Sequence, residues 1–188
     1  MFKIAYASTA MPVRFAVERR QWAEAASIVP PSGAPPHVTA MAVWARAIGL
    51  ARNGHPAGAR QEVEKLRQLE QQLRASGEDY GGYWAKQVKI QEVEVMAWSA
   101  QAEGDADKAR NLVRKAADDE DAIEKLPVNP GPVIPAREQL GDLLLQQGQP
   151  KQALKEFQLS LSNAPRRRGA LMGVVRASEG LGIPASHN

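Results

Sequence analysis

The sequence contains no cysteine and few histidines or aromatic residues, and these shortages exclude several classes of protein. Without a Cys among its 188 residues, the chain has no disulfide framework, no thiolate metal site and no cysteine nucleophile. The three histidines, His37, His55 and His187, are too scattered to suggest a metal cluster. Aromatic residues make up only 5% of the chain, so we expect a core of Ala, Leu, Val and Ile. This composition favours helices over a β-sandwich.

Motifs for catalysis and cofactor binding are also missing. The glycines lack the context of a phosphate-binding loop, and the sequence has no His-Glu-x-x-His metal motif. The acidic run 118–121 lacks the alternating ligand spacing of a calcium loop, and we interpret it as a solvated helix end. We therefore expect no enzyme activity, no metal and no cofactor.

Long apolar runs are absent as well. No stretch approaches the roughly 18–20 residues that a membrane-spanning helix needs. The apolar N-terminal residues are interrupted by Ser8, Thr9 and Pro12, which argues against a signal peptide. We expect a soluble protein with no membrane partner; its compartment is unknown, with the cytoplasm favoured.

The net charge of +3 is unevenly distributed. Lys and Arg outnumber Asp and Glu by 10 to 5 in residues 1–75, are outnumbered by 12 to 7 in residues 76–128, and lead by 7 to 4 in residues 129–188. Nucleic-acid-binding proteins gather positive charge on one continuous face, and this basic, acidic, basic order does not predict such a face. Nucleic-acid binding is therefore the weakest of the binding hypotheses.

One local pattern recurs four times along the chain. In three cases a Gly precedes an Ala by five residues, namely Gly54 and Ala59, Gly104 and Ala109, and Gly148 and Ala153; the fourth, Arg20 and Ala25, lacks the Gly. A Gly just past a helix end adopts the left-handed conformation that stops the helix. Apolar or small residues lie at helical spacing on both sides, including Val29, Val63, Val113 and Phe157, each four residues after its Ala. Each copy is therefore predicted to be a helix, a tight turn and a second helix.

The repeats are unevenly spaced, and the extra residues can be located. Successive alanines lie 34, 50 and 44 residues apart. Longer helices account for the first excess, and the Pro-rich segment 126–135 accounts for the second, since it cannot be helical throughout. Another Pro-rich insertion, 30–36, separates the first two units. Gly173 and Gly180 keep the separation of Gly141 and Gly148, so a partial fifth unit begins after Pro165.

These residues resemble the 34-residue tetratricopeptide repeat. The match is complete in the last full unit, at Gly141, Ala153, Phe157, Ser160 and Pro165. It is weaker in the second and third units, and weakest in the first, where Val13 replaces a small residue and Pro12 would start or kink the first helix. Residues 124–145 are also similar to the terminal part of larger bacterial proteins with such repeats.

The resemblance implies an all-α, right-handed superhelical solenoid of antiparallel helix pairs, with about nine helices. We expect a single domain over residues 1–188. Its units would span 6–29, 37–75, 83–118 and 134–164, with a partial unit over 166–182.

The family also implies a binding site, because the first helices of its repeats line a concave groove. Carrying those positions over gives a candidate partner-binding groove of Arg14, Trp44, Ile48, Arg52, Glu94, Trp98, Gln101, Glu138, Asp142 and Gln146. We expect Trp44 and Trp98 to be partly exposed there as anchors for a peptide, although both could instead fill gaps between helices. The Lys and Asn of the carboxylate clamp of chaperone-binding relatives are absent, so a chaperone's C-terminal carboxylate is not the expected ligand.

The main hypothesis is therefore a protein-interaction scaffold that binds a peptide or protein partner of unknown identity in the groove. A structural role through self-association is the alternative. Leu171, Val174 and Val175 should form an apolar face with no following helix to cover it, which predicts a weak homodimer through the C-terminal end.

Overall fold

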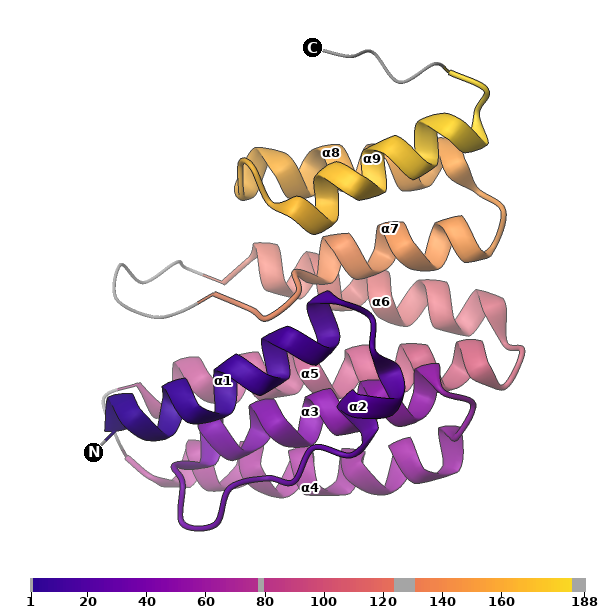
Figure 1. The fold of residues 1–188 in the computed structure, drawn as a ribbon. Coiled ribbons are helices and arrows are strands. Elements are labelled where there is room, and N and C mark those ends of the chain that lie inside the picture. Colours follow the sequence, from indigo (N-terminus) through magenta and orange to yellow (C-terminus); the bar gives the residue numbers. More distant parts are fainter. Residues whose placement is uncertain (1, 78–79, 124–130, 184–188) are drawn as a thin grey trace. The chain divides into compact units, whose positions relative to one another are not determined.

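The computed structural model describes residues 2–77, 80–123 and 131–183. These residues form nine α-helices and no strand (Figure 1). The helices are α1 (Phe2–Glu18), α2 (Trp22–Ala26), α3 (Pro36–Arg52), α4 (Pro56–Ala75), α5 (Gly81–Ala102), α6 (Ala106–Asp121), α7 (Ala136–Gln146), α8 (Pro150–Asn163) and α9 (Arg168–Gly180). The predicted all-α helical-repeat fold is confirmed.

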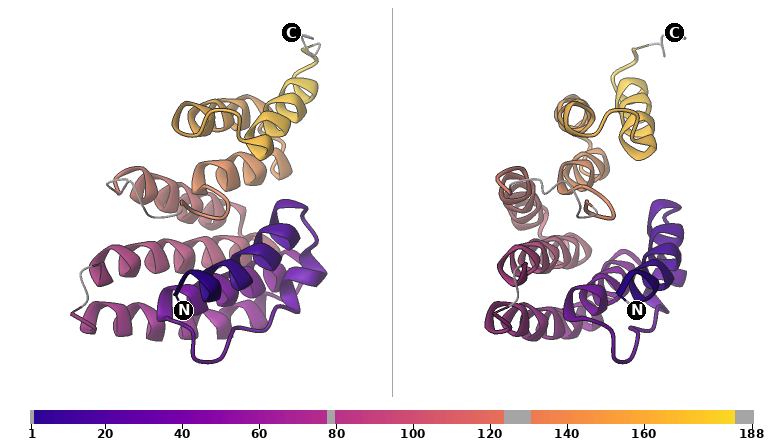
Figure 2. Two further views of the ribbon diagram at one scale, coloured as in Figure 1. Left: turned by 60° about the vertical axis from the view of Figure 1, so that its left-hand side comes forward. Right: turned by 90° about the vertical axis from the view of Figure 1, so that its left-hand side faces the viewer.

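The chain divides into two compact units, Met1–Val133 with α1 to α6 and Ile134–Asn188 with α7 to α9. Within each unit every helix packs against the next one in the chain. In addition, α3 packs against α1 and α5 in the first unit, and α7 packs against α9 in the second. The long helices α3 to α6 run nearly parallel or antiparallel to one another (Figure 2). A single continuous solenoid over both units stays a prediction.

The predicted turns are present and have the predicted conformation. Gly54, Gly104 and Gly148 have φ angles of 82°, 85° and 68°, in the left-handed region that stops a helix. The Asp105 carboxylate caps α6 by accepting a hydrogen bond from the Lys108 backbone N–H at 3.2 Å. In the turn between α1 and α2, Arg20 has a φ of 57°, so this residue adopts the left-handed conformation without being a glycine.

The small residues of the repeats lie where two helices cross closely. Ala25, Ala59, Ala109 and Ala153 are all completely buried. In the second unit the Phe157 ring of α8 lies between Gly141 of α7 and Gly173 of α9, and a Cβ at either glycine would overlap the ring. These contacts explain why the fourth repeat matches the repeat pattern best.

The first repeat differs from its prediction. Helix α1 begins at Phe2 and continues through Pro12, so Pro12 does not start the helix. Helix α2 has only five residues, and Val29 is 81% exposed instead of packing as the other residues at this position do. Pro30 disfavours the helical conformation of Val29, so a helix is not expected to continue through this residue.

The partial fifth repeat differs from its prediction in the position of the glycine that follows its helix. Helix α9 continues to Gly180, and the left-handed residue after it is Gly182, with a φ of 69°. The turn glycine is therefore Gly182, two residues after Gly180, the position given by the spacing of Gly141 and Gly148.

Candidate functional site

The two tryptophans predicted to line an exposed groove are buried. Trp44 on α3 and Trp98 on α5 are each 2% exposed, so the expectation of partial exposure is wrong. The indole Nε1 of Trp44 donates a hydrogen bond to Glu94 Oε2 on α5 at 2.6 Å, and Glu94 is itself buried. The side chains of Trp44 and Glu94 therefore connect α3 and α5, which are the first helices of the second and third repeats.

The next predicted groove residues extend this internal contact. The Arg52 guanidinium lies 3.7 Å from the centre of the Trp98 ring and 4.5 Å from the centre of the Trp22 ring. Such cation–π contacts are favourable, and here they connect α2, α3 and α5. Ile48 is buried as well. These residues stabilise the packing of three helices.

In the second unit the same positions are filled by ion pairs. Glu138 accepts a hydrogen bond from Arg167 Nε at 2.6 Å, and Asp142 accepts one from Arg176 Nη2 at 2.9 Å. Both acids are on α7, while Arg167 immediately precedes α9 and Arg176 lies within it. A Cβ at residue 169 would overlap the Glu138 carboxylate, so Gly169 permits the close approach of α9.

The predicted groove residues therefore hold successive first helices together. Of the ten, only Arg14, Arg52, Gln101 and Gln146 are not buried. A ligand-binding groove along the ten positions stays a prediction. The position of Glu138 or Asp142 in its repeat does not reveal that the neighbouring helix provides an arginine that pairs with it.

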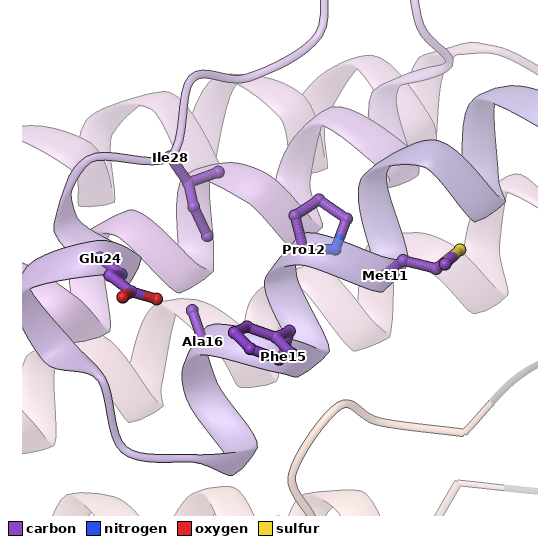
Figure 3. Close-up of a pocket in the computed structure, with 6 residues that line it drawn as sticks. All are labelled: Met11, Pro12, Phe15, Ala16, Glu24 and Ile28. Carbon is purple, nitrogen blue, oxygen red and sulfur yellow. The ribbon is translucent and has the colours of Figure 1, made fainter.

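A different surface of the first unit is open and apolar. A hollow of about 380 Å³ lies between α1 and the segment that contains α2 (Figure 3). It is lined by Met11, Pro12, Phe15, Ala16, Glu24 and Ile28. Met11 is 71% exposed and Phe15 is 56% exposed.

The corresponding positions of the later repeats are buried. Met11 and Phe15 lie 14 and 10 residues before Ala25, and their counterparts before Ala59, Ala109 and Ala153 are Ala45 and Gly49, Val95 and Ser99, and Gln139 and Leu143. All six counterparts are buried. At Gly49 the covering element is α2, because a Cβ there would overlap the α2 backbone at Trp22 and Ala26. Thus Met11 and Phe15 expose a helix face that, in α3, is covered by the second helix of the preceding repeat.

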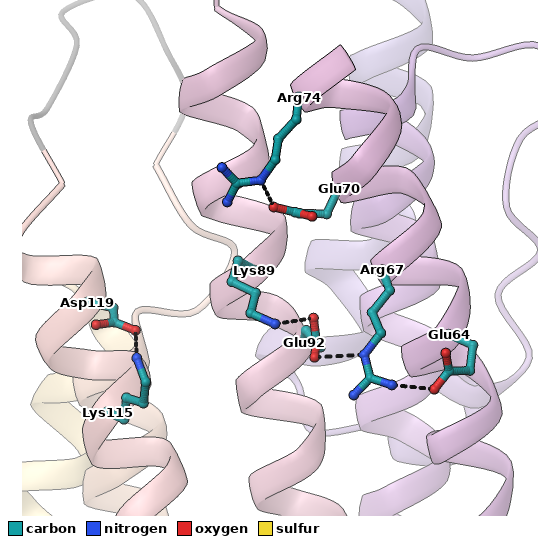
Figure 4. Close-up of polar contacts among 8 residues, drawn as sticks. All are labelled: Glu64, Arg67, Glu70, Arg74, Lys89, Glu92, Lys115 and Asp119. Atoms are coloured by element: carbon teal, nitrogen blue, oxygen red, sulfur yellow. Dashed lines mark hydrogen bonds and ion pairs between the residues drawn. The ribbon is translucent and has the colours of Figure 1, made fainter. Parts of the chain in front are cut away.

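A second hollow, of about 280 Å³, is lined by Arg74, Lys86, Lys89, Ile90, Asp119, Ala122 and Ile123. Several of its charges are balanced within the chain (Figure 4): Arg74 pairs with Glu70, Lys89 with Glu92, and Asp119 with Lys115. Glu92 also accepts a hydrogen bond from Arg67 Nε at 3.0 Å, which raises the pKa of Arg67. This hollow offers little net charge to an ionic ligand.

The remaining features of note are an apolar helix face and a buried histidine. On α9, Leu171 is 46% exposed and Val174 and Val175 are half-buried, as expected of an uncovered face. In the first unit His37 stacks on Trp84 with the ring centres 4.4 Å apart. Burial of His37 lowers its pKa to about 4.

Within the described residues, no group of three or more His, Cys, Asp or Glu side chains is arranged to hold a metal ion. Among the same residues, no helix combines the length and the apolar character needed to cross a bilayer.

The fold and these surfaces define a helical-repeat protein built from pairs of helices. The family model described as tetratricopeptide repeat matches residues 40–65, 94–115 and 134–156, which fall in the second, third and fourth helix pairs. These matches show that the three segments resemble tetratricopeptide repeats, and such repeats generally mediate protein–protein interaction. No curated protein and no solved structure matches the chain.

Proposed function

We propose that the chain is a protein-interaction scaffold and that its first unit binds a partner protein at the hollow between α1 and α2. The observation that supports this proposal is the contrast between exposed Met11 and Phe15 and their six buried counterparts in later repeats. Exposed apolar side chains clustered around a concave surface are typical of protein-interaction sites. Burial of each such side chain by a partner would contribute about 1.5–3 kcal/mol.

The hollow is a better candidate than the predicted groove. A ligand in the groove would have to compete with the hydrogen bond from Trp44 to Glu94 and with the stacking of Arg52 between Trp22 and Trp98. At the hollow, a partner would meet Met11 and Phe15 without breaking any of these contacts.

The test is affinity capture from the native host with three forms of the full chain: unchanged, Phe15→Glu and Leu159→Glu. Leu159 is an exposed apolar residue on α8 and therefore a matched control for placing a charge on an apolar surface. We expect a partner that is retained by the unchanged chain and by Leu159→Glu but lost by Phe15→Glu. If every specific partner is retained equally by all three forms, the hollow is not the binding surface.

A second candidate function is self-association through α9, which the exposure of Leu171 favours. A charge at the half-buried Val174 or at Leu171 would then disfavour the dimer. Sedimentation equilibrium of the unchanged chain and of Val174→Glu over a range of concentrations tests it. A monomeric unchanged chain at high concentration contradicts this candidate.

A further inference from the structure

The helix face that borders the hollow has a charge pattern that indicates what kind of partner segment it would accept. Ser8, Met11 and Phe15 are three to four residues apart along α1 and therefore lie on one side of the helix, and Arg19 follows its last residue. All four are exposed. Of these side chains only Arg19 is charged, and its guanidinium lies 4.9 Å from the centre of the Phe15 ring.

The same face of α5 shows how a helix packs there. Counted back from Ala109, the residues that correspond to Ser8, Met11, Phe15 and Arg19 are Glu92, Val95, Ser99 and Glu103. Helix α4, the second helix of the preceding repeat, packs against α5. Two ion pairs join them, one between Arg60 and Glu103 and one between Arg67 and Glu92.

These ion pairs also report the direction of α4. Arg60 lies near the N-terminal end of α4 and pairs with the residue that follows the C-terminal end of α5, whereas Arg67, two turns later, pairs with Glu92 in the middle of α5. The two helices are therefore antiparallel. A helix that packed on α1 in the same way would bring its N-terminal end to Arg19.

At this position the charge is reversed: α5 is followed by Glu103, whereas α1 is followed by Arg19. The residue on the packing helix that corresponds to Arg60 would consequently have to be an acid. An acid near a helix N-terminus is also favoured by the helix dipole. Met11 and Phe15 are larger than Val95 and Ser99, and the flexible Met side chain adapts readily to a packing helix.

We infer that the hollow receives an amphipathic helix of a partner protein, antiparallel to α1, with a carboxylate near its N-terminal end that pairs with Arg19. This inference rests on the proposed function of the hollow, and adds the secondary structure, direction and charge of the bound segment. The helix occupies the place that α2 takes on α3 and α4 takes on α5.

The experiment uses the helix that the chain itself packs in this way. Two fluorescently labelled peptides with the sequence of residues 56–75 are compared, one unchanged and one carrying Arg60→Glu. Fluorescence anisotropy gives the Kd of each for the full chain and for its Arg19→Glu, Phe15→Glu and Leu159→Glu forms, all checked for folding by circular dichroism.

We expect the full chain to bind the Arg60→Glu peptide about threefold or more tightly than the unchanged peptide, as suits one exposed ion pair replacing a repulsion. The Arg19→Glu form should reverse this order. Phe15→Glu should weaken both peptides by about tenfold or more, and Leu159→Glu should change neither Kd.

The other outcomes are distinguishable. If Phe15→Glu weakens both peptides but Arg19→Glu does not reverse their order, the inferred charge and direction are wrong while the hollow remains a binding surface. If Phe15→Glu leaves both Kd values unchanged, binding lies elsewhere and the proposed function of the hollow is contradicted too. If neither peptide binds the full chain, the inferred helix docking is overturned.

Discussion

The first and fourth repeats share the same arrangement of two helices and a turn, but equivalent apolar residues are exposed in the first repeat and buried in the fourth. In both, a buried alanine, Ala25 or Ala153, lies where the second helix crosses the first. Four residues later, Phe157 is buried between two glycines of neighbouring helices, whereas Val29 is 81% exposed beyond the end of its helix. The buried alanine at the crossing is common to both repeats, whereas the residue four positions later is buried only in the fourth repeat, where the second helix continues past it.

Within the first unit, α1 and α3 also differ in how much of their surface is covered by other helices. Helix α3 is covered by α1, α2, α4 and α5 and is buried on most of its surface. Helix α1 packs mainly against α2 and α3, and it exposes Met11 and Phe15. The exposed apolar side chains of the first unit are therefore on the helix that, among the described residues, has less of its surface covered by other helices.

The largest effect expected from this comparison is at Phe157. Replacement by Ala removes a completely buried ring and leaves a cavity between α7, α8 and α9, which should lower the free energy of unfolding by about 3–5 kcal/mol. Val29→Ala, at the same repeat position, should change it by less than about 0.5 kcal/mol because the side chain is exposed. Urea unfolding of both variants measures the difference, and equal losses would mean that the two repeats are not packed differently.

The next largest effect concerns the contacts that replace the predicted groove. Trp44→Phe keeps an aromatic ring but removes the N–H that hydrogen-bonds to buried Glu94, so we expect a loss of about 1–3 kcal/mol in unfolding free energy. Trp84→Phe is the control, because Trp84 is half-buried and a phenyl ring can still stack on His37. A loss at Trp44 no larger than that at Trp84 would return the groove interpretation to consideration.

A smaller effect should distinguish the turns of the two repeats. Gly148→Ala places a Cβ in the left-handed region and should cost about 1 kcal/mol. In the first repeat Arg20 already bears this strain, so Arg20→Gly should be neutral or stabilise the fold by up to about 1 kcal/mol. Thermal unfolding measures whether each variant is stabilised or destabilised. A stabilised Gly148→Ala would show that the turns have been aligned incorrectly.

The last prediction concerns His37, whose burial should lower the stability of the first unit on acidification but not at neutral pH. The pKa of His37 is lowered by burial from 6.5 to about 4, so between these values the unfolded chain binds more protons than the folded one. Stability of the first unit should therefore fall as the pH decreases from 6.5 towards 4. The described part of the second unit contains no histidine. Unfolding of His37→Phe over this pH range should show a weaker dependence; an unchanged slope would exclude His37 as its source.

Much of the fold could be predicted because its determinants are local. Gly54, Gly104 and Gly148 end helices through their own backbone conformation, and the alanine five residues later identifies the crossing. That Val29 lies outside the helix could also have been predicted, because Pro30 follows it directly in the sequence.

The site could not be predicted in the same way. The bond between Trp44 and Glu94 joins residues 50 positions apart, and the pairs of Glu138 and Asp142 with α9 depend on how closely that helix approaches. A position within a repeat shows which way a side chain faces, but not whether the neighbouring helix already provides its hydrogen-bond or ion-pair partner. The exposure of Met11 and Phe15 likewise depends on a neighbouring helix and not on their own sequence.

The central claim is that α1 exposes a face that is buried in the later repeats, and thiol labelling tests it most directly. The chain contains no cysteine, so Phe15→Cys and Ser99→Cys each introduce a single thiol at equivalent repeat positions. Both variants are reacted with a thiol reagent under native conditions, and the rates are compared with those of the urea-unfolded chains. We predict that Cys at residue 15 reacts at nearly its unfolded rate, whereas Cys at residue 99 is protected by at least about a hundredfold. Equal protection at the two positions would contradict the account.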